Sequence, residues 1–106
     1  MMYTGGTMGK DQIKQRVRQA VCTMPFKEHV RKMYLFGSQL HGMAKEDSDV
    51  DLLVELRGIV GYFDLVRMEK YLEESLRMPI DLVTPECLSK YIRPKVLREK
   101  ELVYDA

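Results

Sequence analysis

The stretch that decides the fold is YLFGSQLHGMAKEDSDVDLLVEL, residues 34–56. A short apolar run at 33–36 stops at Gly37, which predicts a strand of about four to six residues. Residues 38–43 are expected to form a short helix, and a polar loop follows it. The chain then enters a second strand at about 49–56, which is rich in Val and Leu.

The flanking segments predict further helices and strands. Apolar residues recur at helical spacing over 11–24, where Asp11 is a candidate N-cap and Pro25 limits the helix. A second amphipathic helix is expected over 62–78, with Glu69, Lys70, Glu73 and Glu74 on its solvent side. A strand is expected at 80–84, then a helix interrupted or offset near Pro94 and a short edge strand at 101–104. This order predicts an α+β or α/β domain, with a small sheet covered by helices.

Length and composition favour one domain over residues 1–106, with 1–10 as a loosely ordered lead-in. Lys and Arg total 17 against 16 Asp and Glu, so the charge of +1 does not favour nucleic acid as a partner. No apolar run reaches the ~20 residues that cross a bilayer, and no membrane partner is expected. Cys22 and Cys87 are expected to be free thiols in a cytoplasmic protein.

Asp49 and Asp51 form the first candidate site. Side chains alternate along a strand, so both carboxylates are expected on one face, roughly 7 Å apart at ~3.3 Å per residue. Two like charges repel unless a cation lies beside them, and a set of oxygen ligands favours Mg²⁺ or Mn²⁺. The alternative is that Asp49 caps the loop and Asp51 faces solvent, as charges on edge strands commonly do.

Gly37 and Ser38 precede this pair at the expected junction of a strand and a helix. There, backbone N–H groups and the Ser38 hydroxyl could face a phosphate, and glycine allows the close approach of the backbone. The alternative is an ordinary turn with Ser38 as the N-cap.

Asp81 interrupts the apolar segment PIDLVT, residues 79–84, and would share a face with Val83. If this strand lies beside the strand of Asp49 and Asp51, three carboxylates converge. Asp81 would then share the metal and accept a proton from an attacking hydroxyl. The alternative is an exposed aspartate on an edge strand.

The Gly-Ser pair, ten intervening residues and Asp-x-Asp together resemble the signature of the DNA polymerase beta superfamily of nucleotidyltransferases. Within it, residues 30–104 resemble the minimal nucleotidyltransferases, the MNT-type antitoxins encoded beside HEPN toxins. The resemblance also includes PIDLVT and the ending IRPKVLREKELVY, residues 92–104.

This resemblance implies a mixed β-sheet flanked by helices, two Mg²⁺ ions and an NTP, usually ATP, as substrate. Gly37 and Ser38 would hold the triphosphate, Asp49 and Asp51 would bind metal, and Asp81 would act as ligand and base. It further implies transfer of AMP to a tyrosine of a cognate HEPN toxin, which silences that partner. The short chain leaves the acceptor site to be completed by the partner or by a second copy of the chain.

One departure from the resemblance concerns charge. Many relatives carry Arg directly after the Gly-Ser pair and another soon after, whereas this sequence has Gln39 and His41. Lys45 could replace the lost positive charge. His41 could act as a catalytic base, but a solvated histidine on a helix is the favoured explanation. A second hypothesis therefore stays open, in which the chain is a non-catalytic antitoxin that neutralises its partner by binding.

Overall fold

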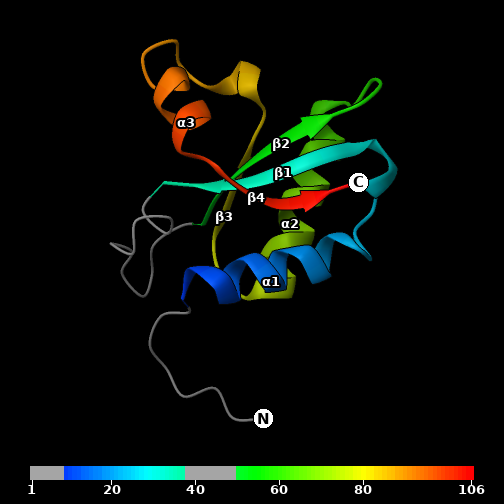
Figure 1. The fold of residues 1–106 in the computed structure, drawn as a ribbon. Coiled ribbons are helices and arrows are strands. Elements are labelled where there is room, and N and C mark those ends of the chain that lie inside the picture. Colours follow the sequence, from blue (N-terminus) through cyan, green and yellow to red (C-terminus); the bar gives the residue numbers. More distant parts are fainter. Residues whose placement is uncertain (1–8, 38–49) are drawn as a thin grey trace.

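The computed structural model describes residues 9–37 and 50–106 of the chain (Figure 1). Within these ranges the strands form a four-stranded sheet in the order β3-β2-β1-β4. β1 is antiparallel to β2 and to β4, whereas β2 and β3 are parallel, so the sheet is mixed as expected. The elements in chain order are α1 (Lys10–Val21), η1 (Lys27–His29), β1 (Val30–Phe36), β2 (Val50–Leu56), α2 (Tyr62–Leu76), β3 (Ile80–Val83), η2 (Pro85–Cys87), α3 (Arg93–Glu99) and β4 (Glu101–Asp105).

The predicted order of elements is confirmed wherever the structure describes the chain, but several boundaries differ. Asp11 is not the N-cap of the first helix; Gly9 takes that position, and Asp11 lies in the first turn, where a carboxylate suits the helix dipole. Of the two alternatives at Pro94, interruption is wrong: Pro94 lies at the start of α3, where its missing N–H costs nothing. The helix expected at 38–43 lies outside the described residues.

The two faces of the sheet carry separate hydrophobic clusters. Figure 1 shows α1 and α2 on one side of the sheet and α3 on the other. The larger cluster joins α1 and α2 to the strand residues Val50, Leu52 and Val54. A smaller cluster on the other face contains Leu53, Leu88 and Val96. Because strand side chains alternate, Asp51 lies on the face of this smaller cluster.

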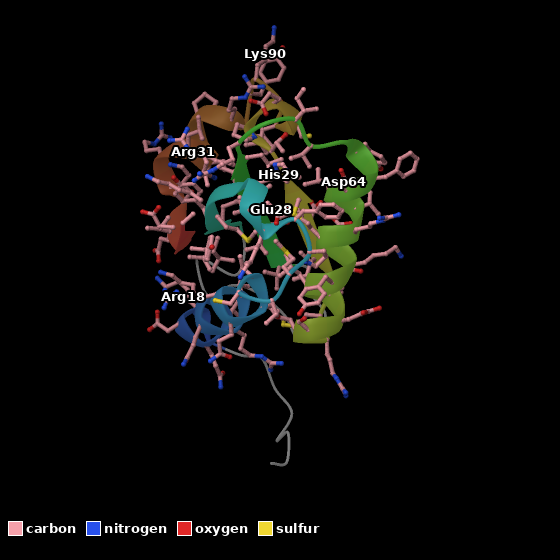
Figure 2. All side chains as sticks on the ribbon, turned by 90° about the vertical axis from the view of Figure 1, so that its right-hand side faces the viewer. Arg18, Glu28, His29, Arg31, Asp64 and Lys90 are labelled. Atoms are coloured by element: carbon pink, nitrogen blue, oxygen red, sulfur yellow. The ribbon has the colours of Figure 1, made fainter. Side chains whose placement is uncertain are left out.

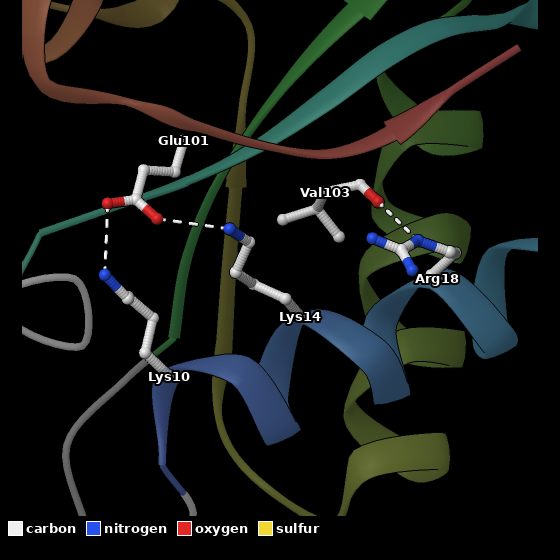
Figure 3. Close-up of polar contacts among 5 residues, drawn as sticks. All are labelled: Lys10, Lys14, Arg18, Glu101 and Val103. Atoms are coloured by element: carbon white, nitrogen blue, oxygen red, sulfur yellow. Dashed lines mark hydrogen bonds and ion pairs between the residues drawn. The ribbon is translucent and has the colours of Figure 1, made fainter.

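Side chains of α1 protect the β4 edge of the sheet. Along β4, Arg18 Nε donates to the carbonyl oxygen of Val103 at 3.0 Å, and Lys10 and Lys14 each donate to Glu101 at 3.1 Å (Figure 3). These contacts pair the outer edge of β4 with α1 and so hinder the addition of a foreign strand. None of the helices in the described ranges has the length and apolar character that a membrane span requires.

The Glu101 contacts predict a pH-dependent contribution to stability. Hydrogen bonds from Lys14 and Lys10 lower the pKa of Glu101 below its ordinary value. Its stabilising effect is therefore fully present above the unfolded-state pKa and is lost as pH falls through the lower folded-state pKa. Because the Glu101 side chain is 37% exposed, we expect Glu101→Gln to cost only about 0.5–1 kcal/mol at neutral pH.

Urea denaturation of the wild type and Glu101→Gln at pH 7 and at pH 3 measures this effect. The difference in the free energy of unfolding between the wild type and Glu101→Gln should be smaller at pH 3 and in high salt. Glu74→Gln, which removes an exposed charge from α2, is the matched control. An equal loss in both variants would show that the α1–β4 ion pairs contribute nothing specific.

Candidate active site

Asp51 and Asp81 lie directly opposite each other on neighbouring parallel strands. Asp51 pairs with Asp81 in the register of β2 and β3, and Leu53 pairs with Val83 two residues further on. Neighbouring strands are about 4.8 Å apart, and alternation places both carboxylates on the face of Leu53 and Val83. Like charges in directly opposite positions destabilise a sheet, so this arrangement favours a cation between them.

The position of β2 bears on the alternative explanation for Asp51. β2 is an interior strand between β3 and β1, and Asp51 is half-buried. Asp51 is therefore not a solvent-facing charge on an edge strand. A half-buried carboxylate on an interior strand, facing a second carboxylate, is suited to bind a divalent metal ion.

The position of Asp81 agrees in part with each of its two explanations, as a metal ligand and as an exposed aspartate on an edge strand. β3 is an edge strand, and Asp81 is exposed, as the alternative predicted. Its register opposite Asp51, however, meets the condition set for converging carboxylates. An ordinary solvated aspartate gains nothing from facing a second carboxylate, so the register favours the metal-binding explanation.

Two glutamates of α2 fix the strand that carries Asp81. The backbone N–H of Ile80 donates to Glu73 Oε2 at 3.3 Å, and that of Leu82 donates to Glu69 Oε2 at 2.9 Å. Both glutamates are half-buried, so their predicted place on the solvent side of the helix was wrong. Hydrogen bonds on either side of Asp81 hold its backbone in place. The sequence signal that could have found them is two acids at i and i+4 on the helix that precedes a short edge strand.

Gly37 lies against the carboxylate of Asp51. Phe36 is the cross-strand partner of Asp51, so the residue after it is close to the same side chain. A Cβ on Gly37 would overlap the Asp51 Oδ2 oxygen and would lie only 3.1 Å from its Cγ. The φ angle of +84° also falls in the region that favours glycine. Both the turn and the close approach therefore require glycine here.

Asp49 and Ser38 lie outside the described residues, as do Gln39, His41 and Lys45. Their contributions to metal and phosphate binding stay predictions. Within residues 9–37 and 50–106, no group of three or more His, Cys, Asp or Glu side chains could hold a metal ion. The described part of the proposed metal site is thus the pair Asp51 and Asp81, and Asp49 would complete it.

The donor chemistry fits a hard divalent cation. Asp51 and Asp81 offer carboxylate oxygens, which Mg²⁺ and Mn²⁺ prefer, and such ions often keep water or substrate phosphate as further ligands. Because Gly37 has no side chain, the Asp51 carboxylate can lie directly against its backbone.

We expect Gly37→Ala to distort the site as well as the backbone. A left-handed φ costs a non-glycine residue roughly 1–2 kcal/mol, and the overlap with Asp51 adds to this cost. Gly58→Ala is the matched control, because Gly58 also has a positive φ of +73° but its Cβ would lie 3.5 Å from the nearest atom, in His29. Urea denaturation should show a larger loss for Gly37→Ala, together with weaker Mn²⁺ binding. Equal losses and unchanged metal binding would contradict the contact between Gly37 and Asp51.

Comparison with known proteins finds a matching family model and several relatives. The model of the family described as "Nucleotidyltransferase domain" matches residues 14–103. Protein adenylyltransferase MntA of Thermococcus cleftensis is 44% identical over 70 residues, which cover 66% of this chain and 71% of that protein.

Two solved structures share the fold. A minimal nucleotidyltransferase is 33% identical with a TM-score of 0.74, over 92% of this chain and 98% of that one. The second structure is of a tri-AMPylated HEPN toxin of Shewanella oneidensis in complex with an MNT antitoxin. Its matching chain is 16% identical with a TM-score of 0.65, over 92% of this chain and 73% of that one. The signature residues, the mixed sheet and these matches together show that the chain belongs to the nucleotidyltransferase domain family.

Proposed function

We propose that the chain is a Mg²⁺-dependent enzyme that transfers AMP from ATP to a tyrosine hydroxyl of a cognate HEPN-type toxin, and so acts as an antitoxin. The observation that carries this proposal is the register of β2 and β3, which sets Asp51 opposite Asp81. Paired carboxylates on one face of a sheet suit the binding of metal ions to a triphosphate.

The proposed reaction is an in-line displacement at the α-phosphorus of ATP. The tyrosine oxygen forms a bond to that phosphorus, the bond to the oxygen bridging the α- and β-phosphates breaks, and pyrophosphate leaves. Asp49, Asp51 and Asp81 serve as metal ligands, and Asp81 also accepts the tyrosine proton. When bound, Mg²⁺ supplies positive charge to the triphosphate and to the attacking oxygen. Gly37 and Ser38 are proposed to position the triphosphate beside the carboxylates.

The known relatives support the choice of nucleotide and acceptor. The relative from Thermococcus cleftensis is a protein adenylyltransferase, and the toxin in the Shewanella oneidensis complex is AMPylated. A hydroxyl held by a partner protein would meet the exposed Asp81 at the edge of the sheet. Both cysteines are exposed free thiols, which is in keeping with the cytoplasm as the place of this reaction.

Transfer of label tests the proposal. The purified chain is incubated with Mg²⁺, the HEPN protein encoded beside it and ATP labelled at the α-phosphate. We expect label on the toxin from α-labelled but not from γ-labelled ATP. Asp51→Asn and Asp81→Asn should each slow transfer at least about 100-fold, equivalent to roughly 2.7 kcal/mol of transition-state stabilisation.

Asp105→Asn is the control, because it removes an exposed carboxylate from the opposite edge strand. It should leave transfer unchanged. Label retained in Asp51→Asn and Asp81→Asn would contradict the proposed metal site. Silencing of the toxin by the wild type without any label would instead establish the non-catalytic antitoxin. Replacement of the labelled toxin tyrosine by phenylalanine should abolish the signal.

A further inference from the structure

Lys100 lies in the same row across the sheet as the two carboxylates. Lys100 immediately precedes β4, and extending the antiparallel register by one residue beyond the Glu101–Leu35 pair places it beside Phe36. Phe36 in turn pairs with Asp51, and Asp51 with Asp81. The row therefore runs from a lysine to two aspartates. Two strand spacings, about 10 Å between Cα atoms, separate Lys100 from Asp51.

The ammonium group of Lys100 lies over the face of the sheet that carries the carboxylates. Its Nζ is 4.2 Å from the centroid of the Tyr34 ring, a cation–π contact. Tyr34 packs against the smaller hydrophobic cluster and pairs with Leu53, which is two residues beyond Asp51 on the same face. The positive charge is thus held beside the row that carries the carboxylates.

The Tyr34 ring is itself held in place. Its hydroxyl hydrogen-bonds with Glu55, and burial together with the charge of Glu55 raises the pKa of Tyr34 above its ordinary value. The phenol therefore stays neutral and donates to the carboxylate. A ring packed on one side and hydrogen-bonded at its tip gives the ammonium a fixed platform.

The acid that follows Lys100 in the sequence does not form an ion pair with it. Glu101 accepts hydrogen bonds from Lys10 and Lys14 of α1 instead. In the part of the chain that the structure describes, the ion pairs do not include Lys100. A cation–π contact is weaker than a charge-assisted hydrogen bond to a phosphate oxygen, so the ammonium can leave the ring for such an anionic ligand.

The sequence creates a need for such a cation. No arginine occurs between Gly37 and Asp51, and Lys45 and His41 are the basic residues there. A triphosphate beside several carboxylates requires positive charge beyond that of the metal. We propose that Lys100 binds the β- and γ-phosphates of ATP, with the Tyr34 ring holding its ammonium group ready. This role rests on the proposed function, because it assigns a phosphate-binding residue to the same site.

Nucleotide binding to the chain without its partner tests this role, because no transfer then occurs. Isothermal titration should show that Lys100→Met raises the Kd for Mg-ATP about 10-fold, or roughly 1.4 kcal/mol, and changes the Kd for AMP less than about twofold. Lys100→Arg should restore most of the affinity, since it keeps the charge. Tyr34→Phe should bind ATP nearly as well as the wild type, whereas Tyr34→Leu, which lacks the ring, should bind it less tightly.

Lys90→Met provides a matched control. Lys90 also contacts an aromatic ring, that of Tyr91, with its Nζ 5.4 Å from the ring centroid. Figure 2 shows Lys90 at the extreme top of the molecule, away from the strands. The variant removes the same charge and the same kind of contact, so it should leave the Kd for ATP unchanged. Urea denaturation of each variant identifies any loss of affinity that comes from unfolding.

Two results would overturn the role of Lys100. One is an unchanged Kd for ATP in Lys100→Met, which a weakened Lys45→Met would explain by a role for Lys45 instead. The other is an equal loss of affinity for ATP and AMP in Lys100→Met. A wild type that does not bind Mg-ATP would remove the proposed function as a whole. Normal binding by the wild type and by Lys100→Met would remove only the lysine's role.

Discussion

The repulsion between Asp51 and Asp81 is the constraint on which the interpretation of this structure depends. Two carboxylates that face each other across parallel strands raise the free energy of the folded chain unless positive charge compensates them. The Asp51 side chain is less exposed to solvent than a charge on an edge strand would be, because β2 is an interior strand. The interior position of Asp51 and its register opposite Asp81 therefore suit the binding of a divalent cation that carries a nucleotide.

The rest of the fold keeps the two carboxylates in register. The larger hydrophobic cluster holds β2 and β3 from the opposite face through Val50, Leu52 and Leu82. Glu69 and Glu73 anchor the backbone on either side of Asp81, and Gly37 accommodates the Asp51 carboxylate against its backbone. Apolar packing and backbone hydrogen bonds thus offset the electrostatic cost, as expected where function requires a locally unfavourable arrangement.

The sequence predicted much of this arrangement, because periodicity and Gly/Pro punctuation are local signals. They located the strands of Asp51 and Asp81 and the helix that joins them. Long-range contacts were not predictable in the same way. The pairing of Glu69 with the edge of β3, and that of Lys100 with Tyr34, join elements whose relative placement only tertiary packing sets. The prediction of Asp11 as the N-cap was wrong, because the helix begins at Lys10 and Gly9 is its N-cap.

The most direct test of the metal site is paramagnetic broadening by Mn²⁺ in the NMR spectrum of the isotope-labelled chain, with ATP present. We expect the backbone amide signals of Gly37, Asp51 and Asp81 to broaden together at low Mn²⁺ concentrations and to recover when excess Mg²⁺ competes. Asp51→Asn should abolish the effect at all three positions. Broadening centred on another part of the surface, or broadening near Asp51 that spares Asp81, would contradict a metal ion held between these two carboxylates.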